Sequence, residues 1–414
     1  MTIAGEPISQ PGSARDRIAD GDVLAISNAW PPMANGTGYA LHALVRDLPD
    51  LVALVPTAGT APAGERSRVL RVLRHSGRSG GPFKIHSLLQ HVELVLAPVV
   101  WCLTHRRPAV VVCSQPVFGG VAGLLVSKLF GVPYIVLGLG EEFTTLRQDR
   151  SPFQLRLRLL RATLRHAASI VCIAQNTRRL AVEIYGVPEA KLPVIVPSVD
   201  PSELDSVLAD PVAIGLARKE LTDGGPMLLM AGRLAQAHKG FDRAIEALPT
   251  LLTSVPDAHL VIAGPGDPEL LAALAARLGV GHRVHFLGLV SRAHLLTLFA
   301  ACDVFLLPGR EVQGSAEGFG IVFLEAALAG KPSVAGRVGG AREAVVDGET
   351  GLLVNGESAS EIAQAASLLL ADPAYAQRLG AAARRRALAE FDGTRQRNEF
   401  AAIVRQVGRR SVAP

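Results

Sequence analysis

The sequence is poor in cysteine and in aromatic residues, and it has no long uninterrupted apolar run. Its four cysteines stand apart, without the paired spacing of a metal site, so we expect buried free thiols in a reducing compartment. The first twenty residues are polar, with proline and glycine, which predicts a loose tail rather than a signal peptide. No run is long and clean enough to span a bilayer. These absences favour a cytoplasmic protein. The cysteines are Cys102, Cys113, Cys172 and Cys302.

Length and charge set the next limits. At 414 residues the chain has room for two domains of ordinary size. Hydrophobic residues make up 49% and charged residues 19%, which predicts a large buried core. Residues 1–200 contain 21 Lys and Arg against 14 Asp and Glu, a balance of +7, whereas residues 201–414 contain 21 against 23, a balance of −2. The basic excess of the first half suits an anionic partner there.

Short apolar, β-branched runs alternate with helical stretches along most of the chain. This alternation predicts parallel sheets with helices on both faces, that is, an α/β fold. The pattern restarts after about residue 205, so we expect a tail at 1–20, doubly wound domains at 21–205 and 206–393, and a helix at 394–414 that crosses back to the first domain. The expected strands are residues 22–27, 109–114, 133–139, 169–174 and 192–196, then 226–232, 259–264, 284–288, 304–308, 332–336 and 351–354.

Two cations follow the first expected strand of the second domain. Arg233 comes directly after Gly232, and Lys239 stands just before the helix expected at 241–254. An arginine clamp, a lysine charge and a helix N-terminus together suit a diphosphate. The alternative is a pair of solvated surface cations. After the next strand, Gly264 and Gly266 either let the backbone approach a flat ring or form an ordinary strand-to-helix turn.

Two glutamates bracket the start of a later helix, in "AEGFGIVFLEAALAG". Glu317 precedes the helix expected from about residue 320, and Glu325 lies on its second turn among apolar residues. Carboxylates accept hydrogen bonds from sugar hydroxyls, and Gly318 and Gly320 would let backbone N–H groups reach a phosphate between them. The alternatives are a helix-start acid favoured by the helix dipole and an exposed helix charge.

These motifs follow one another as in a known family. "AGRL…KG", "VIAGPGD", "EGFGIVFLEA", "GKPSVAGRVGGAREAV" and "DGETGLLV" resemble the retaining glycosyltransferases of family 4, including phosphatidylinositol mannosyltransferase-like and polysaccharide-biosynthesis members. The resemblance is strong over residues 225–392 and looser before them. It implies the GT-B fold, two Rossmann-like domains around a cleft.

The resemblance also implies roles for individual residues. Arg233 and Lys239 would neutralise the donor diphosphate, and Glu325 would bond the ribose hydroxyls. Glu317 would hold hydroxyls of the transferred sugar. The chain beside it would contribute to the donor site, as would glycines after the first strand that let a loop close over the phosphates. These further donor-binding residues are Gly36, Gly38, Gly232, Gly264, Gly266, Gly318, Phe319, Gly320 and Ile321.

The implied reaction is front-face substitution with retention, driven by electrostatic stabilisation of the leaving diphosphate and without a metal ion or cofactor. The donor would be GDP-mannose, UDP-glucose or UDP-N-acetylglucosamine, and the acceptor a hydroxyl of a lipid-linked, glycan or small molecule. The chain departs from the family where Leu139 replaces a frequent histidine, a place that Glu141 or Glu142 could fill. A nucleotide-sugar-binding partner or regulator with weak or no catalysis therefore stays open as an alternative.

Arginine-rich segments in the first domain bear on the acceptor. Residues 64–84 and 147–166 suit attachment to an anionic membrane at its inner face, with a solvated basic helix face as the alternative. Nucleic acid is not expected, because aromatic residues make up only 5% and no nucleic-acid motif is present.

Overall fold

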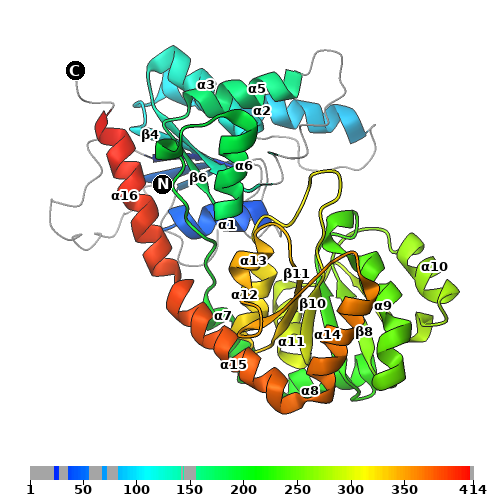
Figure 1. The fold of residues 1–414 in the computed structure, drawn as a ribbon. Coiled ribbons are helices and arrows are strands. Elements are labelled where there is room, and N and C mark those ends of the chain that lie inside the picture. Colours follow the sequence, from blue (N-terminus) through cyan, green and yellow to red (C-terminus); the bar gives the residue numbers. More distant parts are fainter. Residues whose placement is uncertain are drawn as a thin grey trace, which may run out of the picture.

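The computed structural model describes residues 23–27, 36–55, 68–71, 83–140, 143 and 155–410. Within these residues the chain forms two parallel sheets, one above the other in Figure 1, each with helices on both faces. This confirms the predicted α/β class with two Rossmann-like domains. The predicted tail at 1–20, Glu141, Glu142, and most of segment 64–84 lie outside the described residues.

The first sheet has the strand order β3-β2-β1-β4-β5-β6. Helices α2, α3 and α5 pack in sequence on one face, while α1 and α16 cover the other. The strands are β1 (Val23–Ile26), β2 (Leu51–Val55), β3 (Arg68–Arg71), β4 (Val110–Cys113), β5 (Tyr134–Gly138) and β6 (Ser169–Cys172). The helices are α1 (Gly36–Val45), α2 (Phe83–Thr104), α3 (Phe118–Phe130), α5 (Leu155–His166) and α6 (Gln175–Tyr185), followed by the short η2 (Glu189–Lys191).

The second sheet repeats this plan with the order β12-β11-β10-β7-β8-β9. Helices α9, α10 and α14 pack together, and α8, α11, α12 and α15 form the opposite layer. The strands are β7 (Met227–Ala231), β8 (His259–Ala263), β9 (Val284–Gly288), β10 (Val304–Leu307), β11 (Ser333–Gly336) and β12 (Gly351–Val354). The helices are η3 (Ala237–Lys239), α9 (Phe241–Ser254), α10 (Glu269–Arg277), η4 (Gly281–Arg283), α11 (Arg292–Ala301), α12 (Ile321–Leu328), α13 (Ala341–Ala344) and α14 (Ala359–Ala371).

The chain passes between the two sheets twice. It first enters α7 (Pro201–Leu208) and α8 (Pro211–Thr222), each with an aspartate cap directly before an N-terminal proline, a strong helix-start signal. It returns through α15 (Pro373–Glu390) and α16 (Gly393–Arg410), which run along the side of both domains in Figure 1. Val199 and Asp392 form an isolated parallel bridge where the two passages meet. The predicted boundary at residue 205 falls inside α7, which packs against α11 of the second domain.

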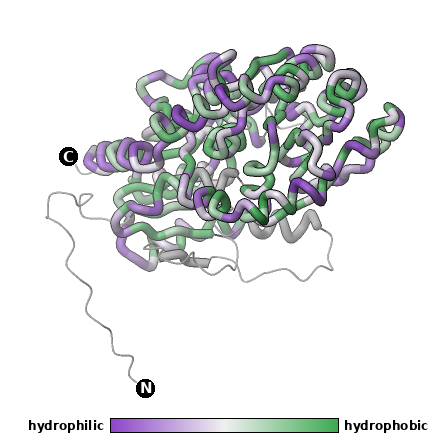
Figure 2. The backbone as a smooth tube through the Cα atoms, turned by 90° about the horizontal axis from the view of Figure 1, so that it is seen from below, coloured by the Kyte–Doolittle hydropathy of each residue, from purple (hydrophilic) through white to green (hydrophobic). Residues whose placement is uncertain are grey.

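The helix at the end of the described chain, α16, is mainly hydrophilic, as its purple colour in Figure 2 shows. Phe400, Val404 and Val407 are its buried apolar side chains and lie on one face, because residues three and four apart are neighbours on a helix. They join the cluster that covers the first sheet. This apolar stripe packs the returning helix against the first domain, and an ion pair of 2.6 Å between Arg397 and Asp47 adds to the contact.

One predicted strand is wrong. Residues 192–196 form only an isolated bridge between Val194 and Cys172. Pro193 lies within this stretch and Pro197 directly follows it, and proline has no N–H to continue a ladder of hydrogen bonds. The structure also contains β2 and β3, which we did not predict.

All four cysteines are buried and free, as the isolated spacing predicts. Burial raises the pKa of the Cys172 and Cys302 thiols to about 12, so neither forms a thiolate near neutral pH. None of the helices within the described residues combines the length and the apolar character that a membrane crossing requires.

The buried His259 of β8 and the half-buried His285 of β9 form a pair from which we expect a pH-dependent stability. His259 Nδ1 lies 2.8 Å from His285 Nε2, and Arg283 Nη1 lies 2.9 Å from His259 Nε2. Because arginine only donates, His259 carries its proton on Nδ1 and donates it to His285. Burial, with the neighbouring charges, lowers the pKa of His259, and burial lowers that of His285.

We therefore expect the thermal midpoint to fall on acidification from pH 7.5 to 5.5. Below pH 6.5, the ordinary pKa of histidine, the unfolded chain binds protons at these two positions while the folded pair stays neutral. The free energy of unfolding that the pair contributes is therefore fully present above pH 6.5, and it is lost as pH falls through the lowered pKa values of the folded state. The double variant His259→Phe/His285→Phe should lose less stability over this interval than wild type. Replacing the exposed His294 with Gln is the control and should leave the wild-type pH dependence. An equal loss in the double variant would contradict the assignment.

Candidate active site

The candidate site lies at the carboxyl ends of β7 and β10, which pair at the centre of the second sheet. From these two strands the sheet continues in opposite directions, to β8 and to β11. Such a switch point is where open α/β sheets bind ligands. Two loops with predicted site residues, 232–240 and 308–320, begin there.

The two loops meet through an ion pair between Lys239 and Glu317. Lys239 Nζ lies 2.7 Å from Glu317 Oε2, and the two side chains are only 11% and 15% exposed. Burial opposes ionisation of Glu317, but the charge and hydrogen bond of Lys239 outweigh it, so the pKa of Glu317 lies below its ordinary value. Two predicted site residues, 78 positions apart in the chain, therefore form one charged unit.

Arg310 holds the loop that carries Lys239. Its guanidinium makes two bonds of 2.8 Å to the carboxylate of Asp242, in the first turn of α9. Gly240, between Lys239 and α9, has a φ of 78°, and a Cβ there would lie 2.3 Å from a backbone oxygen of the loop after β10. The start of α9 is therefore fixed on the neighbouring loop, and Lys239 with it.

Glycines also join the loops after β7 and β8. A Cβ on Gly264 would lie 1.8 Å from the carbonyl oxygen of Gly232, and one on Gly266 would lie 2.8 Å from a side-chain carbon of the β7 loop. Asp267 accepts a backbone hydrogen bond of 2.9 Å at the start of α10, as the alternative of an ordinary turn expects. Arg233 is exposed at the beginning of the β7 loop, on the same edge of the sheet.

The stretch from Glu317 to Ile321 forms the entry into α12. Gly320 has a φ of 86°, and the helix starts at Ile321, as the glycines predict. Its first backbone N–H groups have no partner inside the helix and carry a positive partial charge, which suits a phosphate. A Cβ on Gly318 would lie 2.3 Å from the carbonyl oxygen of Leu139, in the loop after β5. The first domain therefore touches this loop directly.

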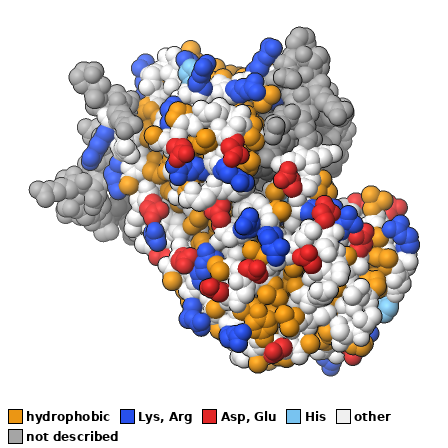
Figure 3. Space-filling view, viewed as in Figure 1, with side chains coloured by type: hydrophobic (Ala, Val, Ile, Leu, Met, Phe, Trp, Pro, Cys, Tyr) orange, Lys and Arg blue, Asp and Glu red, His pale blue; other side chains and the backbone are white. Residues whose placement is uncertain are grey.

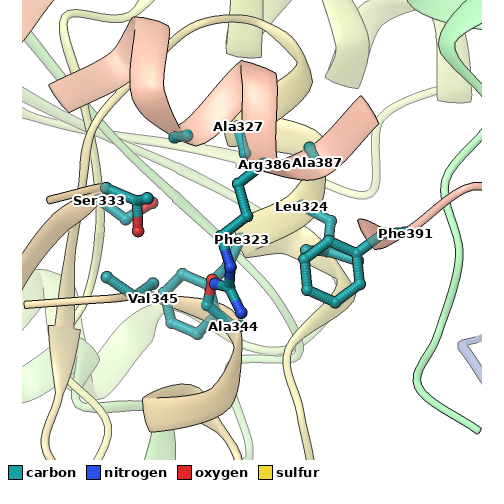
Figure 4. A pocket seen from close by; sticks show the side chains of 11 residues that line it. Phe323, Leu324, Ala327, Ser333, Ala344, Val345, Arg386, Ala387 and Phe391 are labelled. Carbon is teal, nitrogen blue, oxygen red and sulfur yellow. The ribbon is translucent and has the colours of Figure 1, made fainter. Parts of the chain in front are cut away.

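Phe319 points away from this entry into the core. Its ring packs against Phe391, with ring centroids 5.7 Å apart, and Arg386 lies over the other ring at 5.1 Å. Arg386 reaches into a small pocket beneath α12, where it donates 2.9 Å bonds to the carbonyls of Glu343 and Ala344 (Figure 4). Phe319 is thus a packing residue that ties the loop to the crossover at residue 391, and the structure gives it no path to a donor except through its backbone.

Glu325 is 7% exposed, so the alternative of an exposed helix charge is wrong. Its carboxylate pairs with Arg292 at the start of α11. Arg292 also binds Glu203 of α7 at 3.0 Å. The buried carboxylate therefore has a fixed protein partner, and its contact with a donor stays a prediction.

The remaining predicted residues lie in the first domain. Gly36 and Gly38 are in the first turn of α1, after residues 28–35, which lie outside the described chain. Leu139 is half-buried and directly follows β5. The role of the two glycines in closing a loop stays a prediction.

Three charged residues that shape this site were not predicted from the sequence. Arg310 had a usable signal, because it stands three positions after β10 at the same sheet edge as Arg233. Arg292 and Glu343 had none, because their partners come from distant parts of the chain.

Residues 216–386 match the family described as glycosyl transferases group 1, and residues 35–197 match the glycosyl transferase 4-like domain. The two matches lie in tandem, one on each sheet.

Among curated relatives, the GDP-mannose-dependent alpha-(1-6)-phosphatidylinositol monomannoside mannosyltransferase of Mycolicibacterium smegmatis is 39% identical over 53% of this chain and 57% of its own length. The chain therefore matches little more than half the length of that relative. The D-inositol 3-phosphate glycosyltransferase of Nocardiopsis dassonvillei is 26% identical over 92% of this chain and 88% of its own.

Solved structures show the same fold at low identity. Anabaena Alr3699/HepE, in complex with UDP-glucose, superposes with a TM-score of 0.75 at 21% identity and covers 93% of this chain and 100% of its own. WaaG, a glycosyltransferase involved in lipopolysaccharide biosynthesis, superposes with a TM-score of 0.68 at 20% identity and covers 92% of this chain and 99% of its own. With both domain families matched in order and the two-domain fold shared, the chain belongs to the family 4 glycosyltransferases of GT-B fold.

Proposed function

We propose that the protein transfers a hexose from a nucleotide-diphosphate sugar to a hydroxyl group of an acceptor. The observation that carries this proposal is the Lys239–Glu317 pair at the switch point of the second sheet. Lys239 and Glu317 lie within one hydrogen bond of each other, beside the N-terminus of α12, and this supports a cation that would neutralise the diphosphate next to a carboxylate that would accept from sugar hydroxyls. Arg233 at the same edge adds a second cation.

The proposed reaction proceeds with retention at the front face of the sugar and needs no metal ion. The bond from the anomeric carbon to the diphosphate oxygen breaks and its electron pair leaves with the diphosphate. The acceptor oxygen bonds to the same face of the sugar, and its proton passes to the leaving diphosphate oxygen. Lys239, Arg233 and the α12 N-terminus stabilise the charge that develops on the leaving diphosphate. Glu317 orients the sugar for this step.

The donor we place first is GDP-mannose, which is named for relatives at 38–39% identity. UDP-glucose is named for a structure at 21% identity. Incubation with GDP-mannose, UDP-glucose and UDP-N-acetylglucosamine, followed by NMR of the anomeric proton, tests the proposal. We expect one donor to be consumed with its anomeric configuration kept in the product, and an unchanged rate in the presence of EDTA. Inversion, or a rate abolished by EDTA, would refute the mechanism.

A nucleotide-sugar-binding protein with weak or no catalysis is the second candidate. The contact between the backbone of Leu139 and Gly318 favours it, because an apolar side chain stands in the loop that faces the predicted sugar carboxylate. Donor binding in calorimetry without consumption of any donor, in the presence of varied acceptors, would support this candidate over the first.

The acceptor side of the molecule offers a surface for a lipid-linked acceptor. Lys and Arg side chains lie along the upper edge of the first domain in Figure 3, where Figure 1 labels α3 and α5. On α5 the leucines at 157, 160 and 164 are buried, which leaves four arginines exposed. On α2, in the same layer, four exposed apolar side chains share one face: Val92, Leu96, Val100 and Leu103. An apolar stripe and exposed cations on two helices of one layer suit the surface of an anionic membrane.

We expect the protein to bind anionic liposomes at low salt. Each arginine near such a surface contributes up to about 1 kcal/mol, and screening acts over about 8 Å at physiological salt, so binding should be largely lost near 1 M salt. Replacing the α5 arginines with Gln should reduce sedimentation and leave nucleotide binding unchanged. The four positions are Arg156, Arg158, Arg161 and Arg165.

A matched control removes four arginines from the second domain instead. All four are exposed and distant from α5: Arg277, Arg337, Arg378 and Arg385. Equal losses in the two variants would show a general charge effect without a specific surface. Wild-type protein that stays in the supernatant at low salt would remove the membrane proposal and favour a water-soluble acceptor.

A further inference from the structure

Helix α6 of the first domain begins without a cap of its own. The residue before it, Ala174, has extended backbone angles and no side chain that could accept a hydrogen bond. The first backbone N–H groups of a helix need outside partners, and serine, threonine, aspartate or asparagine usually supplies one. Here the partner comes from the other domain.

The carboxylate of Glu343, on α13 of the second domain, accepts hydrogen bonds from the first two backbone N–H groups of α6. The N–H of Gln175 donates to Oε2 at 2.8 Å, and the N–H of Asn176 donates to Oε1 at 2.9 Å. The carboxylate charge also meets the positive end of the α6 dipole. Ala174 itself is fully buried in the apolar cluster of the second domain, so the start of α6 is docked there.

Glu343 is fixed by contacts of its own segment with the loop 308–320, which carries Glu317. The N–H of Gly340, one residue before α13, donates to the carbonyl of Glu317 at 2.9 Å, and a Cβ on Gly340 would lie 1.9 Å from the carbonyl oxygen of Gly318. From the other side, Arg386 binds the backbone carbonyl of Glu343. A movement of Glu343 would therefore move the loop that carries Glu317.

We propose that Glu343 is a positioning residue that sets the arrangement of the two domains for sugar transfer. By capping α6 it holds the first domain where Leu139 meets Gly318, directly beside Glu317. Its part in transfer rests on the proposed function, whereas its part in holding the domains together does not. Glu343 contacts neither Arg233 nor Lys239, the predicted diphosphate-binding residues of the β7 loop. Its loss should therefore lower kcat and leave the affinity for the nucleotide nearly unchanged.

The first measurement is the distance between the domains. Because the native cysteines are buried, dyes can be attached to cysteines introduced at the exposed positions Leu129 and Leu270, one in each domain. We expect Glu343→Ala to lower the energy transfer between the dyes. The exposed Glu349→Ala, six residues along the chain, is the matched control and should not change it. This readout needs no activity, so it stands even if no donor is consumed.

The second measurement is kinetic. We expect Glu343→Ala, which removes both hydrogen bonds to α6, to lower kcat about tenfold, with the Kd for GDP or UDP within about threefold of wild type. Glu343→Gln keeps one acceptor oxygen, so its kcat should lie between those of wild type and Glu343→Ala.

A helix cap supplied within the first domain separates positioning from simple stabilisation. Adding Ala174→Ser to Glu343→Ala gives α6 its own acceptor. If Glu343 positions the domains, the thermal midpoint recovers while the dye distance and kcat do not. If the thermal midpoint, the dye distance and kcat all recover, Glu343 acts only as a helix cap. An unchanged dye distance in Glu343→Ala alone would overturn the proposal.

Discussion

Lys239→Ala should lower the rate of sugar transfer by about 100-fold or more, the usual effect of removing one preorganised charge contact to a developing anion. Arg233→Ala should have an effect of similar size. Both cations lie at the edge of the sheet where the diphosphate is proposed to leave. Initial rates with the accepted donor measure the effect, and replacement of the exposed Lys219 with Ala is the control. Near wild-type rates in both variants would contradict the diphosphate assignment.

The loss of Lys239 also leaves Glu317 buried without its cation. Removing one partner of a buried pair typically costs about 3–5 kcal/mol, so the single variant should unfold at a lower temperature. The double variant Lys239→Met/Glu317→Gln removes both charges and should recover much of that stability. It should remain as inactive as Lys239→Ala. Activity that returns together with stability would mean that the pair only holds the fold.

Glu325→Gln should weaken binding of the bare nucleoside diphosphate about tenfold, whereas Glu317→Gln should mainly lower kcat. Glu325 is proposed to bind the ribose, which does not react, and Glu317 the sugar, whose bonding changes in the transition state. Calorimetry with GDP and UDP, together with steady-state kinetics, separates the two effects. If Glu317→Gln weakens nucleotide binding more than Glu325→Gln does, the roles are reversed.

The ion pair of Glu325 with Arg292 supplies the control for this experiment. Arg292→Gln breaks the pair but keeps the carboxylate. If Glu325 binds ribose, Arg292→Gln should weaken nucleotide binding less than Glu325→Gln. Equal effects would mean that Glu325 acts through its pair with Arg292 rather than through the donor.

Much of the second domain could be predicted because its signals are local. The helix expected at 241–254 matches α9 residue for residue, since its apolar stripe begins directly after a glycine. The first domain was harder. The run "LVALV" of β2 follows a Pro-Asp turn and was as readable as the others, whereas β3 has the sequence "RVLR", whose arginines hide its strand character.

The site divides in the same way. Glycine positions and the start of α12 follow from the sequence, because only glycine fits φ angles such as the 86° of Gly320. The hydrogen bond between Lys239 and Glu317 could not be predicted from the sequence. The two residues are 78 positions apart, and their contact depends on how two loops meet at the edge of the sheet. The cap that Glu343 provides for α6 depends on the arrangement of two domains, which no local pattern encodes.

The most direct test of the account is a crystal structure with the accepted nucleotide sugar. We predict the diphosphate against Lys239, Arg233 and the first turn of α12, the ribose against Glu325, and the hexose hydroxyls against Glu317. A donor bound elsewhere, with the Lys239–Glu317 pair undisturbed and free of contact with it, would contradict the central claim.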